Sequence, residues 1–210
     1  SDKRAPREAL IVIPETVSEV SGPRCGRESL GGASQDLTRP SGRGAEALGQ
    51  RIIVHGHILD EDKRPVPDAL VEIWQANAAG RYIHALDSHP APLDPNFYGA
   101  GRTVTADDGT YTFTTIKPGP YPIMGLNNYW RPAHIHLSLF GPSFLTRLVT
   151  QLYFEGDPLI QHDMIYSTAP ESSREAMIAK FDMSATKSEW ALAYRFDIVL
   201  RGQKNTHIEA

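Results

Sequence analysis

Two histidines one residue apart, His134 and His136, are the strongest chemical feature of the chain. They lie at the start of the apolar run AHIHLSLF, whose alternation is typical of a β-strand. Because successive strand residues point to opposite faces, both imidazoles face one side of the sheet and Ile135 faces the other. Such a pair serves either as two metal ligands or as part of a polar sheet face. His55 and His57 have the same spacing, so spacing alone does not decide between these roles.

The surroundings of the downstream pair favour the metal role. Two long loops upstream each carry a tyrosine in a Gly/Pro-rich setting, Tyr82 in GRY and Tyr121 in PGPYP. The prolines on both sides of Tyr121 restrict the backbone and so fix the direction of its phenol. Arg131 lies three residues before His134 and adds a positive charge. The upstream histidine pair lies inside a predicted strand with no tyrosine, acid or stiff loop beside it.

Other candidate motifs are better explained as turns. Asp94-Pro95-Asn96, Asp107-Asp108-Gly109 and Glu155-Gly156-Asp157-Pro158 consist of residue types that are typical of turns. The single cysteine, Cys25, cannot form an intrachain disulfide, and its surroundings indicate an inert thiol. No nucleophile elbow, P-loop or dinucleotide fingerprint occurs. A zinc hydrolase built on the downstream histidine pair would need a carboxylate base nearby, which the sequence does not show.

The composition is that of a soluble globular protein. The chain has 210 residues, of which 40% are hydrophobic and 22% are charged. A net charge of −4 argues against a nucleic-acid-binding protein. We expect no signal peptide or membrane span, because no apolar stretch reaches the ~18 residues that a span needs. Together with the single cysteine, this predicts a cytoplasmic protein without nucleic-acid or membrane partners.

The elements that would position these residues are mostly strands. Residues 1–48 are rich in Gly, Ser, Pro and Arg and are expected to form an irregular N-terminal arm before a catalytic domain at 49–210. Strands are predicted at 51–59, 69–77, 109–116, 133–140, 147–154 and 191–202. One short helix is predicted at 172–181, and long loops are predicted at 78–102 and 117–129. Without a βαβ rhythm, this pattern predicts an all-β fold, a β-sandwich with long active-site loops.

Several strings of the sequence occur in the order found in the intradiol ring-cleavage dioxygenases. They are GRYIHALD, LDPNFYGAGR, DDGTYTFTTIKPGPYP, YWRPAHIHLSLFG, RLVTQLYFEGDP and YRFDIVLRG. From about Arg51 to Gly202 the chain resembles this family, and in particular the iron-bearing β chains of its protocatechuate-cleaving members. The resemblance implies a β-sandwich that uses O2 to cleave a substituted catechol between its two hydroxyl-bearing carbons. The implied product is a cis,cis-muconate.

The resemblance also implies a non-haem Fe(III) cofactor with four protein ligands. By motif these are Tyr82, Tyr121, His134 and His136, with Tyr121 and His136 as the axial pair. Ferric iron is a hard cation and phenolate is a hard, strongly donating ligand, so this donor set suits Fe(III). Tyr121 would leave the metal and accept a proton when the substrate binds.

Four further residues take roles through the same resemblance. Arg131 would lie beside the substrate ring and stabilise negative charge, and Gln151 would lie near the active-site water. Trp74 matches a wall of the substrate pocket. At Ile123, also expected to line that pocket, the chain departs from the protocatechuate-cleaving members, which have tryptophan there. The ligands are unaffected, but another 4-substituted catechol, such as 4-sulfocatechol, becomes an alternative to protocatechuate.

The resemblance predicts an oligomer. Protocatechuate-cleaving members pair an iron-bearing chain with a homologous iron-free α chain, and the active site lies near their interface. This chain carries all four ligand positions and therefore resembles the iron-bearing partner. The alternative outside enzymology is a β-sandwich module that binds carbohydrate or another protein and holds no iron.

Overall fold

The computed structural model describes residues 35–39, 45–140, 147–200 and 206. Strands dominate these residues. They are β1 (Arg51–Leu59), β2 (Leu70–Gln75), β3 (Ala100–Val104), β4 (Thr110–Ile116), β5 (Tyr121–Pro122), β6 (Trp130–Arg131), β7 (His134–Phe140), β8 (Arg147–Phe154), β9 (Ile178–Phe181), β10 (Leu192–Arg195) and β11 (Ile198–Val199). The helical elements are short: α2 (Met164–Thr168), α3 (Glu171–Arg174) and the 3-10 turns η2 (Ile160–His162) and η3 (Glu175–Met177). The predicted all-β fold class is confirmed.

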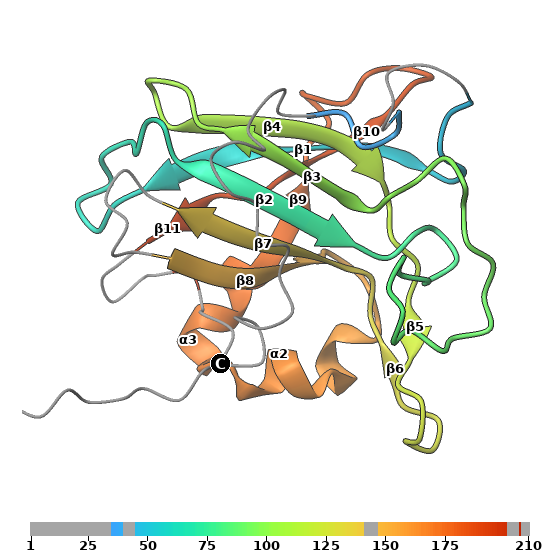
Figure 1. Ribbon diagram of the computed structural model, residues 1–210. Coiled ribbons are helices and arrows are strands. Elements are labelled where there is room, and N and C mark those ends of the chain that lie inside the picture. The colour runs from blue at the N-terminus through green and yellow to red at the C-terminus, as the bar shows by residue number, and fades with distance from the viewer. Residues whose placement is uncertain (1–34, 40–44, 141–146, 201–205, 207–210) are drawn as a thin grey trace, which may run out of the picture.

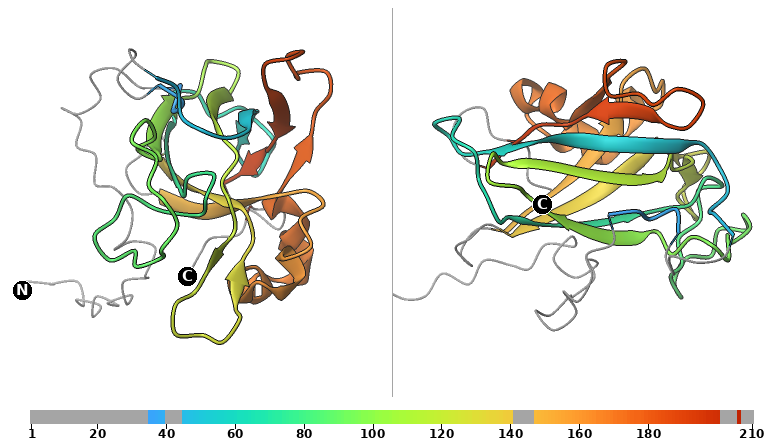
Figure 2. Two further views of the ribbon diagram at one scale, coloured as in Figure 1. Left: turned by 90° about the vertical axis from the view of Figure 1, so that its right-hand side faces the viewer. Right: turned by 90° about the horizontal axis from the view of Figure 1, so that it is seen from above.

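One continuous 9-stranded sheet folds back on itself into two facing layers (Figure 1, Figure 2). The strand order is β11-β1-β10-β9-β8-β7-β2-β3, and β4 pairs with β1 outside this path. The parallel pair of β8 and β9 joins the two layers. Strands β5 and β6 pair separately in a small sheet beyond the end of the layers (Figure 1). This small sheet carries one of the two candidate tyrosines.

The core lies between the layers and fixes the register of β7. Ile135, Leu137 and Leu139 are at most 1% exposed and belong to the same apolar cluster as Val54 and Phe113. Burial of such a side chain stabilises the fold by about 1.5–3 kcal/mol. A register shift by one residue would move all three β7 side chains out of the core. The residues that alternate with them, including both histidines, are therefore forced onto the opposite face.

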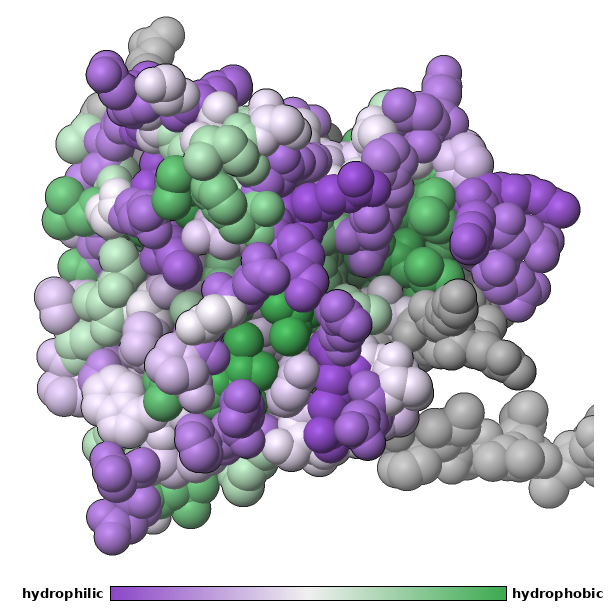
Figure 3. Space-filling model, turned by 180° about the vertical axis from the view of Figure 1, so that it is seen from behind, coloured by the Kyte–Doolittle hydropathy of each residue, from purple (hydrophilic) through white to green (hydrophobic). Residues whose placement is uncertain are grey.

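A smaller apolar cluster forms where the helical segment packs below β8 (Figure 1). Tyr153 of β8 belongs to this cluster together with Ile160, Ala169 and Met177. Asp163 is the N-cap residue of α2, and its side chain accepts a hydrogen bond from the Ile165 N–H. On the far side of the molecule, hydrophobic residues are interspersed among hydrophilic ones (Figure 3). Within the described ranges, no helix is long and apolar enough to cross a membrane.

The structure corrects four predicted elements, one of which is the loop predicted at 117–129, because it contains β5. The helix predicted at 172–181 survives only as α3 and the turn η3, and its last residues form β9 instead. β9 pairs with β8 and β10, so sheet pairing outweighs the local helical pattern. The loop predicted at 78–102 contains the start of β3, which pairs with β2. The strand predicted at 191–202 is divided into β10 and β11, and its last two residues lie outside the described ranges.

The predicted N-terminal arm is described only in part, and Cys25 lies outside the described ranges. At 35–39 the arm runs beside β4, where Asp36 forms a parallel bridge with Thr114. The Leu37 N–H donates to the Thr114 carbonyl at 2.8 Å, and the Leu37 side chain is 2% exposed. This segment covers an open sheet edge, which would otherwise be free to pair with another chain.

Candidate metal centre

β7 presents His134 and His136 on its face away from the core, between β2 and β8. The register pairs His136 with Trp74 of β2 and Gln151 of β8, and it pairs His134 with Tyr153 of β8. Trp74 stacks on His136, with the ring centroids 4.9 Å apart and an interplanar angle of 5°. The neighbouring strands therefore set the positions of both imidazoles.

Tyr82 lies in the loop after β2, and polar side chains of the same loop hold its backbone. Asn77 Oδ1 accepts hydrogen bonds from the N–H groups of Ala79 and Arg81, each at 2.9 Å. The Tyr82 N–H donates to Asp87 Oδ2 at 2.8 Å. The Arg81 guanidinium donates to three carbonyls further along the loop. These local hydrogen bonds take the place of regular secondary structure and fix the backbone of Tyr82, from which its side chain projects.

Tyr121 begins β5 and pairs with Arg131 across the two-stranded sheet. The PGP segment before it passes directly against the loop of Tyr82. A Cβ atom on Gly80 would lie 2.3 Å from the Pro120 carbonyl oxygen, and a Cβ on Gly119 would be similarly crowded by the Tyr82 loop. The two tyrosine loops are therefore packed backbone against backbone, which glycine alone permits.

A Gly80→Ala variant is expected to separate the two tyrosine loops. Gly80 has a φ of +77°, and the added Cβ would collide with backbone. The strained φ costs about 1–3 kcal/mol for a non-glycine residue, and the collision adds to it. We expect a lower midpoint of thermal unfolding and a lower iron content. Gly125→Ala is the control, because Gly125 has a φ of +87° but no atom within 4 Å of the added Cβ. Equal loss of iron in both variants would contradict the role of the close contact.

Four donor atoms converge where these elements meet. The Tyr82 Oη lies 3.2 Å from His136 Nε2 and 3.5 Å from His134 Nε2. The Tyr121 Oη lies 3.4 Å from His134 Nε2. Protein ligands held about 2 Å from one ion lie roughly 3 Å from each other, so these separations fit a shared metal. In the described part of the chain, no three His, Cys, Asp or Glu side chains cluster, so a metal here depends on the phenols.

The hydrogen bonding of His134 prepares it as a ligand. Its Nδ1 lies 2.7 Å from the Pro132 carbonyl oxygen, which can only accept, so Nδ1 carries the proton. Nε2 then holds a lone pair that faces the two phenols. Burial, together with the charge of Arg131, holds the pKa of His134 well below its ordinary value. The imidazole is therefore neutral, which is the form that binds metals.

Arg131 connects the four donor atoms to a buried polar cluster. Its Nη1 lies 3.4 Å from Tyr121 Oη and 3.2 Å from His134 Nε2. Its Nη2 donates to Gln151 Oε1 at 2.6 Å and to Asp163 Oδ2 at 2.8 Å. Arg131 is 4% exposed and Gln151 is fully buried. The structure thus brings Arg131 and Gln151, both predicted site residues, next to the candidate ligands.

Three members of the cluster were not predicted as site residues: Tyr129, Tyr153 and Asp163. Tyr153 lies two residues after Gln151 on the same strand, so strand alternation could have identified it. Asp163 lies between η2 and α2, where no periodicity marks it. Only the fold brings Asp163 beside Arg131.

The predicted pocket residue Ile123 lies in the turn between β5 and β6. Its N–H donates to the Tyr129 carbonyl at 2.9 Å and closes the hairpin. Met124 and Leu126, in the same turn, are 58% and 47% exposed. The hairpin therefore presents an apolar rim directly after Tyr121. Contact of Ile123 or Trp74 with a substrate stays a prediction.

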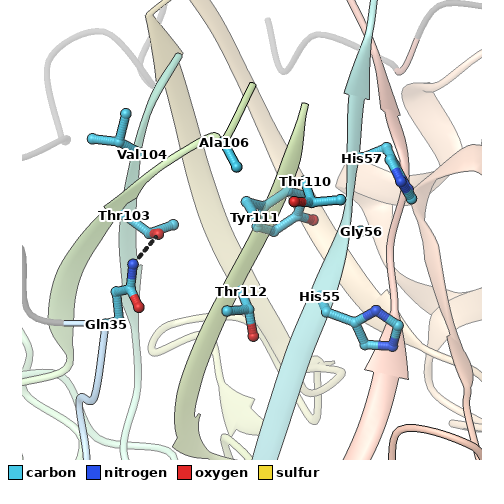
Figure 4. A pocket seen from close by; sticks show the side chains of 10 residues that line it. All are labelled: Gln35, His55, Gly56, His57, Thr103, Val104, Ala106, Thr110, Tyr111 and Thr112. Atoms are coloured by element: carbon cyan, nitrogen blue, oxygen red, sulfur yellow. Dashed lines mark hydrogen bonds between the residues drawn. The ribbon is translucent and has the colours of Figure 1, made fainter. Parts of the chain in front are cut away.

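The upstream histidine pair does not join the donor set. His55 Nε2 lies 3.1 Å from Asp182 Oδ2, and His57 Nδ1 lies 3.5 Å from Asp197 Oδ1. Both residues line a pocket of about 310 Å³ (Figure 4). Figure 4 shows that their imidazoles project from β1 on the side away from Thr103. Tyr111, the tyrosine among the residues that line this pocket, donates its hydroxyl to the Phe196 backbone carbonyl at 2.6 Å instead of facing the imidazoles as a ligand would.

Comparison with known proteins identifies the family. A family model described as a dioxygenase matches residues 20–202. The chain belongs to the intradiol ring-cleavage dioxygenases. It is 51% identical over 209 residues to the β chain of protocatechuate 3,4-dioxygenase from Burkholderia cepacia, with 100% of this chain and 89% of that one covered. It is 30% identical over 210 residues to the α chain from Pseudomonas putida, with 94% and 96% covered.

A solved structure supports the same family. Catechol 1,2-dioxygenase from Acinetobacter sp. ADP1 is 28% identical with a TM-score of 0.57, over 79% of this chain and 55% of that one. The present dioxygenase thus spans about half the length of that relative. It is an oxidoreductase of aromatic catabolism, and its relatives include both chain types of a two-chain enzyme. A non-enzymatic binding module and a zinc hydrolase are therefore set aside.

Proposed function

We propose that this dioxygenase binds non-haem Fe(III) through Tyr82, Tyr121, His134 and His136 and cleaves protocatechuate by the intradiol route. The observation that carries the proposal is a chain of three short separations, 3.2–3.5 Å, that links the two imidazole nitrogens and the two phenol oxygens. Anionic phenolates favour ferric over ferrous iron. When bound, ferric iron would withdraw electron density from a catecholate and open its ring carbon to O2.

The chain's own residues handle protons and charge in this proposal. Tyr121 Oη would act as the proton acceptor for a hydroxyl of the incoming catechol. Arg131 Nη1, which lies 3.4 Å from that oxygen, donates hydrogen bonds to negative charge that develops on the substrate. Gln151 holds the other terminal nitrogen of the guanidinium through its Oε1. Trp74, stacked on His136, keeps that ligand in place.

A Tyr121→Phe variant is expected to change the visible spectrum and slow turnover by about 10²-fold, the typical size of a general acid–base contribution. The ring remains to fill space, but the donor oxygen is lost. The measurements are the visible absorption and the steady-state rate of O2 uptake. Tyr98→Phe is the matched control, because Tyr98 is 59% exposed. A Tyr121→Phe enzyme with an unchanged spectrum and rate would remove Tyr121 from the ligand set.

The substrate proposal rests on the Burkholderia cepacia relative, which is named as a protocatechuate 3,4-dioxygenase. Because Ile123 stands where the protocatechuate-cleaving members have tryptophan, 4-sulfocatechol is the second candidate. Oxygen uptake with catechol, protocatechuate and 4-sulfocatechol, with identification of the products, separates them. The highest kcat/KM with protocatechuate and formation of the carboxy-substituted cis,cis-muconate would support the proposal. Preference for the sulfonated substrate would overturn it while leaving the reaction class intact.

We also propose that this chain is the iron-bearing member of a two-chain oligomer. Support comes from the ligand residues, which are all present here, and from the match to both a β and an α chain. Co-expression with a homologous α chain and size-exclusion chromatography with light scattering test this. A single complex that contains both chains is expected, and separate elution would contradict the pairing.

A further inference from the structure

Asp163 is a buried carboxylate that accepts five hydrogen bonds. It is 0% exposed. Its Oδ1 accepts from the Tyr129 hydroxyl at 2.9 Å, the Arg131 Nε at 3.3 Å and the Ile165 N–H at 3.2 Å. Its Oδ2 accepts from Arg131 Nη2 and from the Tyr153 hydroxyl, each at 2.8 Å. These donors come from β6, β8, α2 and the turn between β5 and β6.

The Asp163 carboxylate restricts the Arg131 guanidinium to one orientation. Two of the three guanidinium nitrogens, Nε and Nη2, are held by Asp163, and Nη2 also contacts Gln151 and Tyr153. Only Nη1 faces Tyr121 and His134. A free arginine side chain samples many rotamers, and the bidentate pair with Asp163 removes this freedom before a substrate arrives.

Charge supports the same arrangement. Burial raises the pKa of Asp163, but the hydrogen bonds and the charge of Arg131 outweigh it, so the pKa lies below its ordinary value. Asp163 is therefore ionised and neutralises the buried guanidinium. A buried arginine without this partner would be drawn toward solvent, because an unpaired buried charge is strongly unfavourable.

We infer that Asp163 is a positioning residue for ring cleavage, which fixes Arg131 so that its Nη1 edge faces the candidate iron site. The inference rests on the proposed function for its catalytic consequence. Asp163 itself touches none of the four candidate ligands through a hydrogen bond described in the structure. It acts through Arg131, and it has a second, separate task as the N-cap of α2.

The two tasks of Asp163 can be separated by substitution. Serine caps a helix about as well as aspartate but is too short and uncharged to hold a guanidinium. Asp163→Ser should keep α2 and release Arg131. Asp163→Asn keeps the shape and one acceptor oxygen but removes the charge. We expect kcat to fall about 10–100-fold in Asp163→Ser and less in Asp163→Asn, with a smaller change in KM. Iron content and the thermal unfolding midpoint serve as measures of folding.

A double-mutant cycle distinguishes positioning from a general structural role. In the Arg131→Gln background, adding Asp163→Ser should lower kcat/KM by less than about threefold, because the residue it positions is already absent. Thermal stability should recover relative to Arg131→Gln alone, because both charges are then removed. Asp182→Ser is the matched control, since Asp182 likewise caps a backbone turn but pairs with His55 instead. We expect it to retain wild-type kcat.

A readout in the iron-free protein tests the same inference independently of catalysis. The Arg131 Nε–H should give a slowly exchanging signal in ¹H–¹⁵N spectra of the wild-type apoprotein and lose it in Asp163→Ser. If the wild-type protein proves to lack iron, the proposed function fails, while this spectrum still tests the positioning. Wild-type kcat in folded Asp163→Ser, or full additivity with Arg131→Gln, would overturn the inference. If Asp163→Ser does not fold, Asp163→Asn and Tyr129→Phe in the same cycle decide.

Discussion

A His134→Ala variant is expected to purify without iron and to lose ring-cleaving activity by at least about 10³-fold, since the metal supplies most of the catalytic power in such sites. The physical reason is that His134 Nε2 lies next to both phenol oxygens, at 3.4 and 3.5 Å. Its removal would leave a site with two phenols and one imidazole, too few to hold ferric iron tightly. Iron quantification and O2 uptake with protocatechuate measure the two effects.

The chain offers a matched control for this variant. His55→Ala removes an imidazole with the same sequence spacing, which pairs with Asp182 instead of with tyrosines. It should retain its iron and its rate. The account would be contradicted by a His134→Ala protein that keeps iron and activity, or by a His55→Ala protein that loses them.

An Arg131→Gln variant is expected to be both slower and less stable. Removal of the guanidinium leaves Asp163 buried and without its counter-charge, which typically costs about 3–5 kcal/mol of the free energy of unfolding. Loss of one preorganised donor next to the reacting oxygens should lower kcat by about 10²–10³-fold. Urea unfolding of the apoprotein and steady-state kinetics of the iron-loaded enzyme measure these effects separately.

Arg195→Gln is the control for the loss of an arginine–aspartate pair. Arg195 pairs with Asp197 at the surface at 2.8 Å, and its side chain is 54% exposed. An exposed pair contributes at most about 1 kcal/mol, so little change is expected in stability or rate. Comparable losses of the free energy of unfolding in both variants would show that burial does not increase the contribution of the Arg131–Asp163 pair to stability.

The half of the candidate site on β7 could be predicted from the sequence because strand alternation determines it. Ile135, Leu137 and Leu139 fill the core, so the histidines that alternate with them must share the opposite face. The tyrosines were identified by their stiff, glycine-containing loops and by the family resemblance. Their convergence with the histidines depends on contacts between distant loops, such as the one at Gly80, which no local pattern encodes.

The cluster behind Arg131 could not be predicted in the same way. Asp163 lies about thirty residues from Arg131, in a segment with irregular backbone, and the long-range fold alone brings them together. The helix expected at 172–181 was wrong in its second half for a related reason. The apolar residues at 178–181 satisfy a helical pattern, but the open edges of β8 and β10 offer them sheet pairing instead.

The visible absorption spectrum of the protein, purified from iron-replete cells, tests the central claim most directly. Two tyrosinate ligands on Fe(III) predict a red-brown protein with a broad charge-transfer band, which disappears when the iron is removed by a chelator and returns on reloading. A colourless, iron-free protein from such cells would contradict the assignment of Tyr82, Tyr121, His134 and His136 as ligands of ferric iron.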